Sequence, residues 1–410
     1  SDELEYSWKK LMQNHPHDSI CCCSVDEVQD EMATRFNKSK QVADYLVSEG
    51  KRYIADKINT KEYEKYKNVL PFVVFNTTGR ERTSVVSVEI DVTRKSGWLK
   101  KCAYDLDEIN VPNYKLIDSD GNSIPFKIED LGVKFGYDLP KDKFRQPYMA
   151  RRVRVTFEAE NISAVGYKTY ALVEGDTEKV TDTLVSSENC MENDAIRVEI
   201  NKNGSLNVTD KASGRTYKGV AYYEETGDLG NEYMYKMPEG SKAITTQDTV
   251  AKIELAEDEP YRAMYKITNT ITVPKSGDDN FEDEKSHMVF FKERVGGRSN
   301  DTVEMKIETF VSLDKNGKGV KIKTRFDNEV KDHRVRIMVP TGINSDVHKA
   351  DSVFEVVTRN NRHNAGWNNP SACEHEQGFV SIDDGEKGIA VANIGLYEYE
   401  MLPDLDNTIA

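Results

Sequence analysis

The chain has 410 residues and a formal net charge of −15. That length suffices for two or three domains with buried cores. The acidic balance argues against non-specific binding to nucleic acid or to an anionic membrane surface, and no stretch approaches the ~20 consecutive apolar residues of a membrane span. We therefore expect neither nucleic acid nor a membrane as a partner.

Two helices are expected first. Asp2 and Glu5 have the spacing of a helix cap, and Pro16 ends that helix or forces a turn. Ser24 and Glu27 match a capping box, which predicts a long second helix from near Val25. Apolar residues recur at helical spacing, which predicts one buried stripe on each helix. The stripes are Leu4, Trp8, Leu11 and Met12, then Val25, Val28, Met32, Phe36, Val42, Ala43 and Leu46.

His17 and Asp18 fall in the connection between these helices. An imidazole and a carboxylate held between packed helices are preorganised and can face a cleft, which favours metal binding or catalysis. The alternative is a solvated turn in which Asp18 caps the following residues. Because no histidine follows at four residues and no Cys-x-x-Cys is present, the segment cannot complete a zinc site alone. The triplet at 21–23 is expected to be small, partly buried thiols.

Beyond the helices the hydrophobic period becomes two, which predicts strands. They are expected at 70–76 and 85–92 around a turn at Gly79, in a hairpin over 114–125, and at 152–159. Asp120 and Gly121 supply the positive φ angles of that hairpin. We expect helices over residues 1–58 and a small antiparallel β-sandwich over 59–175.

The polar segment 174–189 is the best linker candidate. After it, turns are expected at Asn203-Gly204 and Ser213-Gly214. Further strands are expected at 264–273, 303–311, 320–326 and 335–339, with surface loops at 277–280 and 296–300. Their β-branched content and length suit a large antiparallel sandwich over 176–410. The predicted fold class is mainly β, with two antiparallel sandwiches preceded by helices.

The six cysteines are sparse, and three of them are adjacent. Such spacing does not suit a disulfide framework, so a reducing compartment is expected. The corresponding location is the cytoplasm.

Four segments carry the distinctive motifs, and they occur in one order. They are His-Pro-His-Asp-Ser-Ile with the Cys-Ser-Val-Asp-Glu-Val and Arg-Phe that follow (15–36), Gly-Asp-Leu-Gly-Asn-Glu-Tyr-Met-Tyr (227–235), Asn-Glu-Val-Lys-Asp-His-Arg-Val-Arg through Pro-Thr (328–341), and Gly-Ile-Ala through Gly-Leu-Tyr-Glu-Tyr-Glu (388–400). Together they resemble the bacterial family 38 glycoside hydrolases, which are zinc-dependent retaining α-mannosidases. One departure is Cys22, where the family pattern has glycine, so the backbone turn there is expected to be reshaped.

The resemblance implies that the chain is one piece of an α-mannosidase acting on α-mannoside carbohydrate. It would comprise the end of the helical middle domain and most of the β-rich C-terminal part, including an incomplete galactose mutarotase-like super-sandwich over 176–410. The catalytic barrel would lie upstream, so no catalytic residue is assigned in this chain. His17 would be a zinc ligand, and Asp18 would hydrogen-bond sugar hydroxyls.

Tyr233 resembles a family tyrosine that reaches toward the sugar. Tyr235, or a purely structural aromatic residue, is the alternative there. The triplet Asp332-His333-Arg334 is a family marker that we interpret as a buried ion-pair corner. We expect the isolated chain to be inactive and to carry no stoichiometric zinc, because one histidine cannot hold the ion against water.

Two other functions stay open. The chain could be a carbohydrate-binding sandwich module, with Trp98 and Trp367 as candidates for stacking on sugar rings. It could also be a scaffold through which the intact enzyme forms a homo-oligomer, because an uncovered face between domains would be apolar. Saturable sugar binding without turnover favours the module, and metal-independent self-association favours the scaffold.

Overall fold

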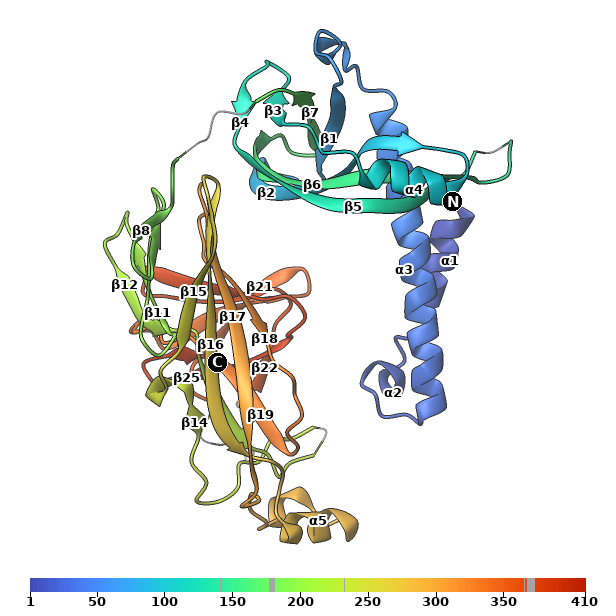
Figure 1. Ribbon diagram of the computed structural model, residues 1–410. Helices are drawn as coiled ribbons and strands as arrows, with labels where there is room; N and C mark the ends of the chain where they lie inside the picture. Colours follow the sequence, from blue (N-terminus) through green and yellow to red (C-terminus); the bar gives the residue numbers. More distant parts are fainter. Residues whose placement is uncertain (141, 177–180, 232, 365, 367–372) are drawn as a thin grey trace. The chain divides into compact units, whose positions relative to one another are not determined.

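The computed structural model describes residues 1–140, 142–176, 181–231, 233–364, 366 and 373–410. The chain divides into two units (Figure 1). The first comprises Ser1–Arg80, Pro112–Ile124 and Ile162–Thr177, and the second comprises Glu81–Val111, Pro125–Asn161 and Glu178–Ala410. The predicted class, mainly antiparallel β with helices at the N-terminus, is confirmed. The domain boundaries expected from the sequence stay a prediction.

The first unit begins with helices that meet through small polar side chains. They are α1 (Asp2–Met12), α2 (His17–Ile20), α3 (Asp26–Ala55) and the 3₁₀ turn η1 (Lys61–Tyr63). The Ser7 hydroxyl lies 3.0 Å from the Ser39 hydroxyl and donates to the Ser39 carbonyl. Asn14 donates its side-chain amide to the Met32 carbonyl at 2.9 Å. Because serine side chains are short, α1 and α3 can approach closely there.

The predicted caps of both long helices are wrong. Ser1, rather than Asp2, is the N-cap of α1 and accepts from the Leu4 N–H. Val25 is the N-cap of α3 and makes no side-chain cap bond. Ser24 lies one residue before that cap, so its hydroxyl accepts from the Gln29 side chain instead of closing a capping box.

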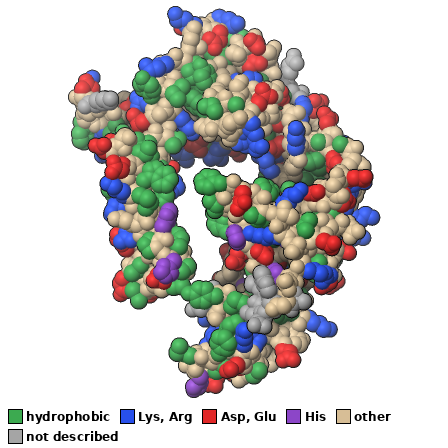
Figure 2. All heavy atoms as spheres, turned by 180° about the vertical axis from the view of Figure 1, so that it is seen from behind, with side chains coloured by type: hydrophobic (Ala, Val, Ile, Leu, Met, Phe, Trp, Pro, Cys, Tyr) green, Lys and Arg blue, Asp and Glu red, His purple; other side chains and the backbone are tan. Residues whose placement is uncertain are grey.

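The predicted burial of the helical stripes is largely wrong within the described residues. Met32 is buried, but Leu4, Trp8, Met12, Val25, Val28 and Phe36 are exposed. Figure 2 shows apolar side chains gathered over the helical part of the molecule. The stripes have helical periodicity, yet α1 and α3 meet through their small polar residues. A periodic pattern predicts a face that has to be covered and does not name the element that covers it.

A four-stranded sheet completes the first unit. Its order is β1 (Leu70–Asn76), β7 (Gly166–Glu174), β3 (Tyr114–Asp118), β4 (Ser123–Ile124), and every pair is antiparallel. Tyr63, Ile117, Ala171 and Val173 form its buried core. The hairpin predicted over 114–125 is confirmed, and Gly121 has a φ of 88°.

The second unit begins with a three-stranded sheet, β2-β6-β5, and a helix. These elements are β2 (Arg82–Lys95), β5 (Phe126–Asp138), β6 (Gln146–Ile162) and α4 (Leu99–Asp107). The strands predicted on either side of Gly79 both exist, but β1 pairs with β7 and β2 belongs to this other sheet. The segment between them is therefore not a hairpin turn. Helix α4 was not predicted.

The rest of the second unit is an assembly of antiparallel sheets around a large hydrophobic cluster, with a further cluster that includes Tyr223, Ile271 and Ile307. The sheets are β12-β11-β10-β9-β8, β14-β13-β19, β15-β16-β17-β18, β21-β20-β23-β24 and β22-β25-β26. Strand bounds are β8 (Val185–Ser187), β9 (Cys190–Glu192), β10 (Ile196–Ile200), β11 (Leu206–Asp210), β12 (Thr216–Val220), β13 (Tyr222–Gly227), β14 (Ile244–Thr245), β15 (Lys252–Glu259), β16 (Arg262–Pro274), β17 (Thr302–Asp314), β18 (Lys321–Arg325), β19 (His333–Met338), β20 (Val347–Ser352), β21 (Glu355–Asn360), β22 (Cys373–His375), β23 (Phe379–Asp383), β24 (Gly388–Ala392), β25 (Glu398–Leu402) and β26 (Thr408–Ile409). Strands β16 and β17 pair along their whole length (Figure 1).

Short helical segments lie between these strands: η2 (Thr246–Asp248), α5 (Asp279–Ser286) and η3 (Phe291–Glu293). The surface loop predicted over 277–280 is wrong in part, because Asp278 caps α5 by accepting from the Phe281 N–H at 2.8 Å. The turn at Asn203-Gly204 is confirmed. Gly204 has a φ of 85°, and a Cβ there would come 2.7 Å from Ile267.

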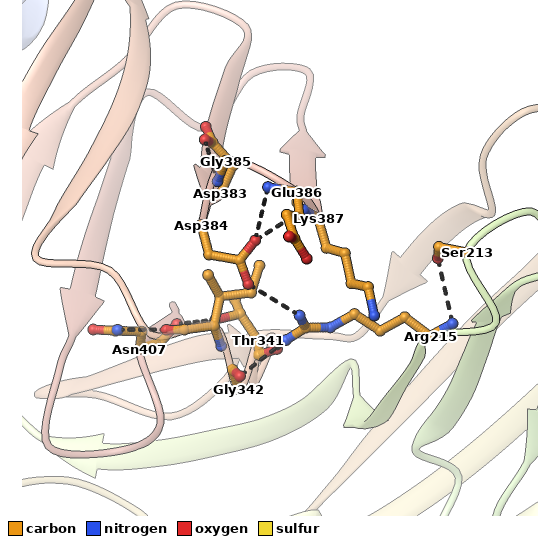
Figure 3. A network of polar contacts seen from close by, with 12 residues as sticks. Ser213, Arg215, Thr341, Gly342, Asp383, Asp384, Gly385, Glu386, Lys387 and Asn407 are labelled. Atoms are coloured by element: carbon orange, nitrogen blue, oxygen red, sulfur yellow. Dashed lines mark hydrogen bonds and ion pairs between the residues drawn. The ribbon is translucent and has the colours of Figure 1, made fainter.

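A polar network joins three chain segments of the large assembly (Figure 3). Arg215 donates to the carbonyls of Thr341 and Gly342 and pairs with Asp384 at 3.5 Å. Backbone N–H groups of Lys387 and Glu386 bond the Asp384 carboxylate and lower its pKa. Arg215 therefore satisfies carbonyls that the sheets leave unpaired.

Candidate functional site

His17 and Asp18 lie side by side in α2, the short helix between α1 and α3. Pro16 is its N-cap, where a fixed φ suits a helix start and no N–H is needed. The His17 Nε2 lies 3.2 Å from the Asp18 Oδ1, and the two side chains are 92% and 71% exposed. An imidazole oriented by a neighbouring carboxylate and open to its surroundings can act as a metal ligand.

The turn after α2 carries three exposed thiols, which corrects the prediction that they are partly buried. Backbone N–H groups of Cys21, Cys22 and Cys23 donate to carbonyls of His17, Ser19 and Asp18, so this short turn uses its donors locally. Thiols carried by so tight a turn have no neighbouring chain to bury them. Cys22 has a φ of 62°. A glycine at this position would adopt the same left-handed conformation without a Cβ penalty.

Tyr233 lies in a loop after β13 that is built on backbone bonds. Asn231 Oδ1 accepts from the N–H groups of Tyr233 and Met234, both at 2.9 Å. A Cβ at Gly230 would overlap the Met234 carbonyl oxygen, so only glycine fits there. The Tyr233 side chain is 70% exposed. The loop therefore presents Tyr233 on its surface.

Tyr235, the alternative to Tyr233, is engaged in the body of the second unit. Its hydroxyl donates to the Thr226 hydroxyl at 2.9 Å. The Arg334 guanidinium stacks 3.5 Å from its ring centroid, a cation–π contact. These contacts give Tyr235 a structural role, and the assignment of Tyr233 as the sugar contact stays a prediction.

The triplet Asp332-His333-Arg334 forms buried ion pairs and hydrogen bonds, as predicted. His333 Nδ1 lies 3.2 Å from Glu225, and its Nε2 lies 2.7 Å from the Asn328 Oδ1. Arg298 makes a two-pronged contact with the fully buried Glu225. Burial alone would raise the pKa of Glu225, but the hydrogen bonds from His333 and Arg298 outweigh it and lower that pKa.

Glu400 of β25 is the centre of a second buried cluster. It pairs with Arg334 at 2.9 Å and with Arg336 of β19, which also pairs with Glu224. Burial opposes ionisation of Glu400, but the charges of Arg334 and Arg336 lower its pKa overall. Burial, and then the same carboxylate, raise the pKa of Cys373 to about 11.

Sequence reasoning missed the acidic partners in these clusters. Glu224 and Glu225 sit in a strand whose side chains are all buried, including both carboxylates. Two adjacent glutamates in a buried strand indicate buried ion pairs. Their burial could not be read from the sequence, because it arises only when β13 pairs with β19. Glu400 ends the last of the four motif segments, which was the available signal.

The predicted site residues do not all belong to one unit. His17 and Asp18 are in the first unit and Tyr233 is in the second. Of the two tryptophans considered for sugar stacking, Trp98 is 73% exposed just before α4, and Trp367 lies outside the described residues.

A groove of about 660 Å³ lies along β17 and β18 in the second unit. Its lining is strongly charged and includes Glu304, Lys306 and Glu308. Glu308 pairs with Lys266 and Lys306, whose hydrogen bonds lower its pKa to about 2. Such a lining suits a polar ligand better than an apolar one.

In the ranges that the structure covers, no three His, Cys, Asp or Glu side chains are grouped as metal ligands. None of the described helices has both the length and the apolar composition needed to cross a bilayer.

Comparison with known proteins places this β-rich architecture among the glycoside hydrolases. Residues 67–174 match "Glycosyl hydrolases family 38 C-terminal domain 1", and residues 191–409 match "Glycosyl hydrolases family 38 C-terminal domain". A Halalkalibacterium halodurans protein named "Putative mannosylglycerate hydrolase" is 37% identical over 98% of this chain and 46% of its own length.

Two solved structures from Enterococcus faecalis cover the whole chain. An α-mannosidase of strain V583 is 39% identical with a TM-score of 0.95, and a family 38 protein is 38% identical with a TM-score of 0.91. The chain spans 46% and 48% of those two proteins, about half their length. The chain belongs to glycosyl hydrolase family 38, and it corresponds to the C-terminal domains of that family.

Proposed function

We propose that this chain is part of a zinc-dependent, retaining α-mannosidase, in which His17 binds zinc and Asp18 and Tyr233 contact the sugar. The observation that carries the proposal is the exposed His17-Asp18 pair, with its ring nitrogen and carboxylate oxygen 3.2 Å apart. It lies in the first of the four motif segments that resemble the family. A carbohydrate substrate is also supported by the names of the relatives, a mannosylglycerate hydrolase and an α-mannosidase.

The residues of this chain fit one corner of a zinc site. An exposed imidazole is a suitable nitrogen ligand, and a neighbouring carboxylate can hold its tautomer. Three or four protein ligands are usual for zinc, and the described residues offer no such group. The other ligands would therefore come from outside the described residues. What zinc supplies in such a site is coordination of sugar hydroxyls.

The sugar contacts follow from the chemistry of the exposed groups. Asp18 is 71% exposed, so its carboxylate can accept hydrogen bonds from sugar hydroxyls, and such charge-assisted bonds are short and strong. Tyr233 has a hydroxyl and an aromatic face, and its backbone N–H donates to the Asn231 side chain, which sets the position of the residue.

The bond-breaking groups would lie outside this chain. A retaining glycosidase needs a nucleophilic carboxylate and an acid/base carboxyl about 5 Å apart. The buried carboxylates described here, Glu225 and Glu400, are instead neutralised by arginines. Their lowered pKa values oppose proton donation, which suits structural ion pairs.

The uncovered helical stripes support the idea that more polypeptide packs on this chain. Leu4, Trp8 and Met12 are each about half exposed on α1. The relatives are about twice as long as this chain, so the occupant we propose is the remaining half of the parent protein. A stripe of this kind gains stability when it is covered, by roughly 25 cal/mol per Å² of apolar surface.

The test uses the parent protein that contains this chain and an aryl α-mannoside. We expect hydrolysis with α-mannose as the first product, observed by proton NMR. His17→Ala should lower kcat/KM by at least about 100-fold, and the matched variant His15→Ala, which changes a neighbouring exposed histidine, should leave it unchanged. β-Mannose as the first product, or a fully active His17→Ala variant, would refute the proposal.

A non-catalytic carbohydrate-binding module is the second candidate, favoured by the exposed Trp98 and the charged groove along β17 and β18. It predicts that the isolated chain binds mannose oligosaccharides saturably in calorimetry and that Trp98→Ala abolishes the heat. No binding by the isolated chain, together with turnover by the parent protein, would exclude it.

A further inference from the structure

Cys21 and Cys23 bring two sulfur atoms together on the surface of the first unit. Their Sγ atoms lie 3.4 Å apart, and both residues are exposed thiols. A disulfide has an S–S length of about 2.05 Å, so the sulfurs need to close by little more than an ångström. Residues 19–22 form the turn that ends α2, and the N–H of Cys23 donates to the Asp18 carbonyl of the same helix. The two sulfurs therefore belong to one local structure.

The backbone of the turn holds the two thiols on one side. The Cys21 thiol donates to the His17 carbonyl, and the Cys23 thiol lies 3.8 Å from the Cys21 carbonyl. The residue between them, Cys22, takes a left-handed conformation at φ 62°, which reverses the chain there. The sequence spacing alone does not produce this approach, because residues at i and i+2 of an extended strand share a face but lie roughly 6.6 Å apart along it.

We propose that Cys21 and Cys23 are a redox site that forms a reversible disulfide with a small-molecule disulfide such as oxidised glutathione. The thiolate of one cysteine attacks the oxidant, forms a mixed disulfide and releases one glutathione thiol. The second cysteine then displaces the other glutathione. The chain loses two electrons and two protons, and the oxidant takes them up as two thiols.

Exposure separates the triplet at 21–23 from the other cysteines, and the contact between the Sγ atoms of Cys21 and Cys23 singles out the pair within it. Cys102 and Cys190 are buried and Cys373 is partly buried. Thiol oxidation requires access to the oxidant, so the exposed triplet reacts before the buried thiols. Exposed, strained disulfides are also the more readily reduced ones, which makes the change reversible.

Oxidation also reaches His17 through a direct contact. When Cys21 becomes part of a disulfide, its S–H no longer donates to the His17 carbonyl. The last turn of α2 loses one bond at the residue whose imidazole is exposed beside Asp18. The redox state of the pair therefore changes the hydrogen bonding of the His17 backbone. This second step regulates the proposed zinc ligand and rests on the proposed function.

Sequential alkylation tests which thiols pair. The 410-residue chain is oxidised with oxidised glutathione and treated with N-ethylmaleimide, and is then reduced and treated with iodoacetamide before peptide mass spectrometry. We expect maleimide on Cys22 and carbamidomethyl on Cys21 and Cys23, with loss of two hydrogen atoms from the intact mass. The matched control Cys22→Ser should still form the disulfide. Cys21→Ser and Cys23→Ser should carry glutathione adducts instead.

Maleimide on Cys21 or Cys23 in the oxidised wild-type chain would overturn the proposal, and so would stable glutathione adducts without loss of hydrogen. These readouts need neither zinc nor substrate, so they stand apart from the proposed mannosidase activity. For the link to His17, the ring resonances of His17 should shift on oxidation of wild type and stay fixed in Cys21→Ser, which has no thiol at the His17 carbonyl to oxidise. A disulfide that leaves those resonances unmoved would refute the link.

Discussion

At the residue scale, Cys22 shows how one departure from the family pattern is accommodated. Its φ of 62° is left-handed, where a Cβ costs about 1–2 kcal/mol and glycine has no such penalty. Glycine also loses more entropy on folding, by roughly 0.5–1 kcal/mol. We therefore expect Cys22→Gly to raise the free energy of unfolding of the first unit by about 0.5–1 kcal/mol. Urea titration followed by circular dichroism measures this free energy of unfolding. Cys22→Ala keeps the Cβ and is the control, which should be unchanged. A Cys22→Gly variant no more stable than Cys22→Ala would show that the backbone at Cys22 is not strained.

A substitution at Asp18 tests the role of its negative charge. If its carboxylate accepts from sugar hydroxyls, Asp18→Asn replaces charge-assisted bonds by neutral ones in nearly the same volume. A loss of about 1.5–3 kcal/mol lowers kcat/KM of the parent enzyme by roughly 10- to 150-fold. Steady-state kinetics on an aryl α-mannoside give the value, with the exposed Asp26→Asn as the control. Equal kinetics for the two variants would leave Asp18 as a simple turn residue.

In the candidate site, contacts between neighbours in the chain can be predicted from the sequence, whereas contacts between distant residues cannot. His17 and Asp18 are neighbours in the chain, so their contact at 3.2 Å needs no tertiary information. The choice between Tyr233 and Tyr235 does need it, because Tyr235 is distinguished only by Arg334 and Thr226, which lie far along the chain or in another strand. Composition and residue spacing do not identify tertiary partners of this kind.

At the scale of elements, the Tyr233 loop depends on one glycine. A Cβ at Gly230 would overlap the Met234 carbonyl oxygen, which is backbone and cannot turn aside. We expect Gly230→Ala to destabilise the second unit by about 1–3 kcal/mol and to weaken substrate binding by the parent enzyme through displacement of Tyr233.

Thermal unfolding and KM measure the two effects. Gly319→Ala is the matched control, since no atom lies within 4 Å of a Cβ at that position. A Gly230→Ala variant with the stability of this control would show that the loop rearranges at no cost.

Strands were predicted more reliably than helices in this chain, for a physical reason. Alternation over ten or more residues, as in β16 and β17, is a property of the segment itself, and both strands are where they were predicted. Helix α4 is a nine-residue element between strands, too short for its periodicity to stand out. Ser24 was predicted as the N-cap of α3, and the N-cap is Val25, one residue further along the chain.

At the scale of the whole molecule, the buried carboxylates predict how stability depends on pH. Glu225 and Glu400 both have pKa values below the ordinary value of about 4.3. A lowered folded pKa contributes stability that is fully present above about pH 4.3 and is lost as the pH falls through the folded values. The free energy of unfolding of the second unit should therefore be flat near neutral pH and fall below about pH 4.

Urea titrations between pH 3 and pH 7 would show this fall. Glu400→Gln leaves Arg334 and Arg336 without their shared carboxylate, so it should cost about 3–5 kcal/mol at pH 7. It should also reduce the acid-dependent loss. A variant that keeps the full acid-dependent loss would assign the effect to other carboxylates.

The central claim is that this chain lends one histidine to a zinc site completed elsewhere in the parent protein. The most direct measurement is zinc per molecule, by plasma mass spectrometry after dialysis against a weak chelator. We predict one zinc in the parent protein and in His15→Ala, a strongly reduced content in His17→Ala, and none in the isolated 410-residue chain. Full zinc occupancy in His17→Ala, or one zinc bound by the isolated chain, would contradict the account.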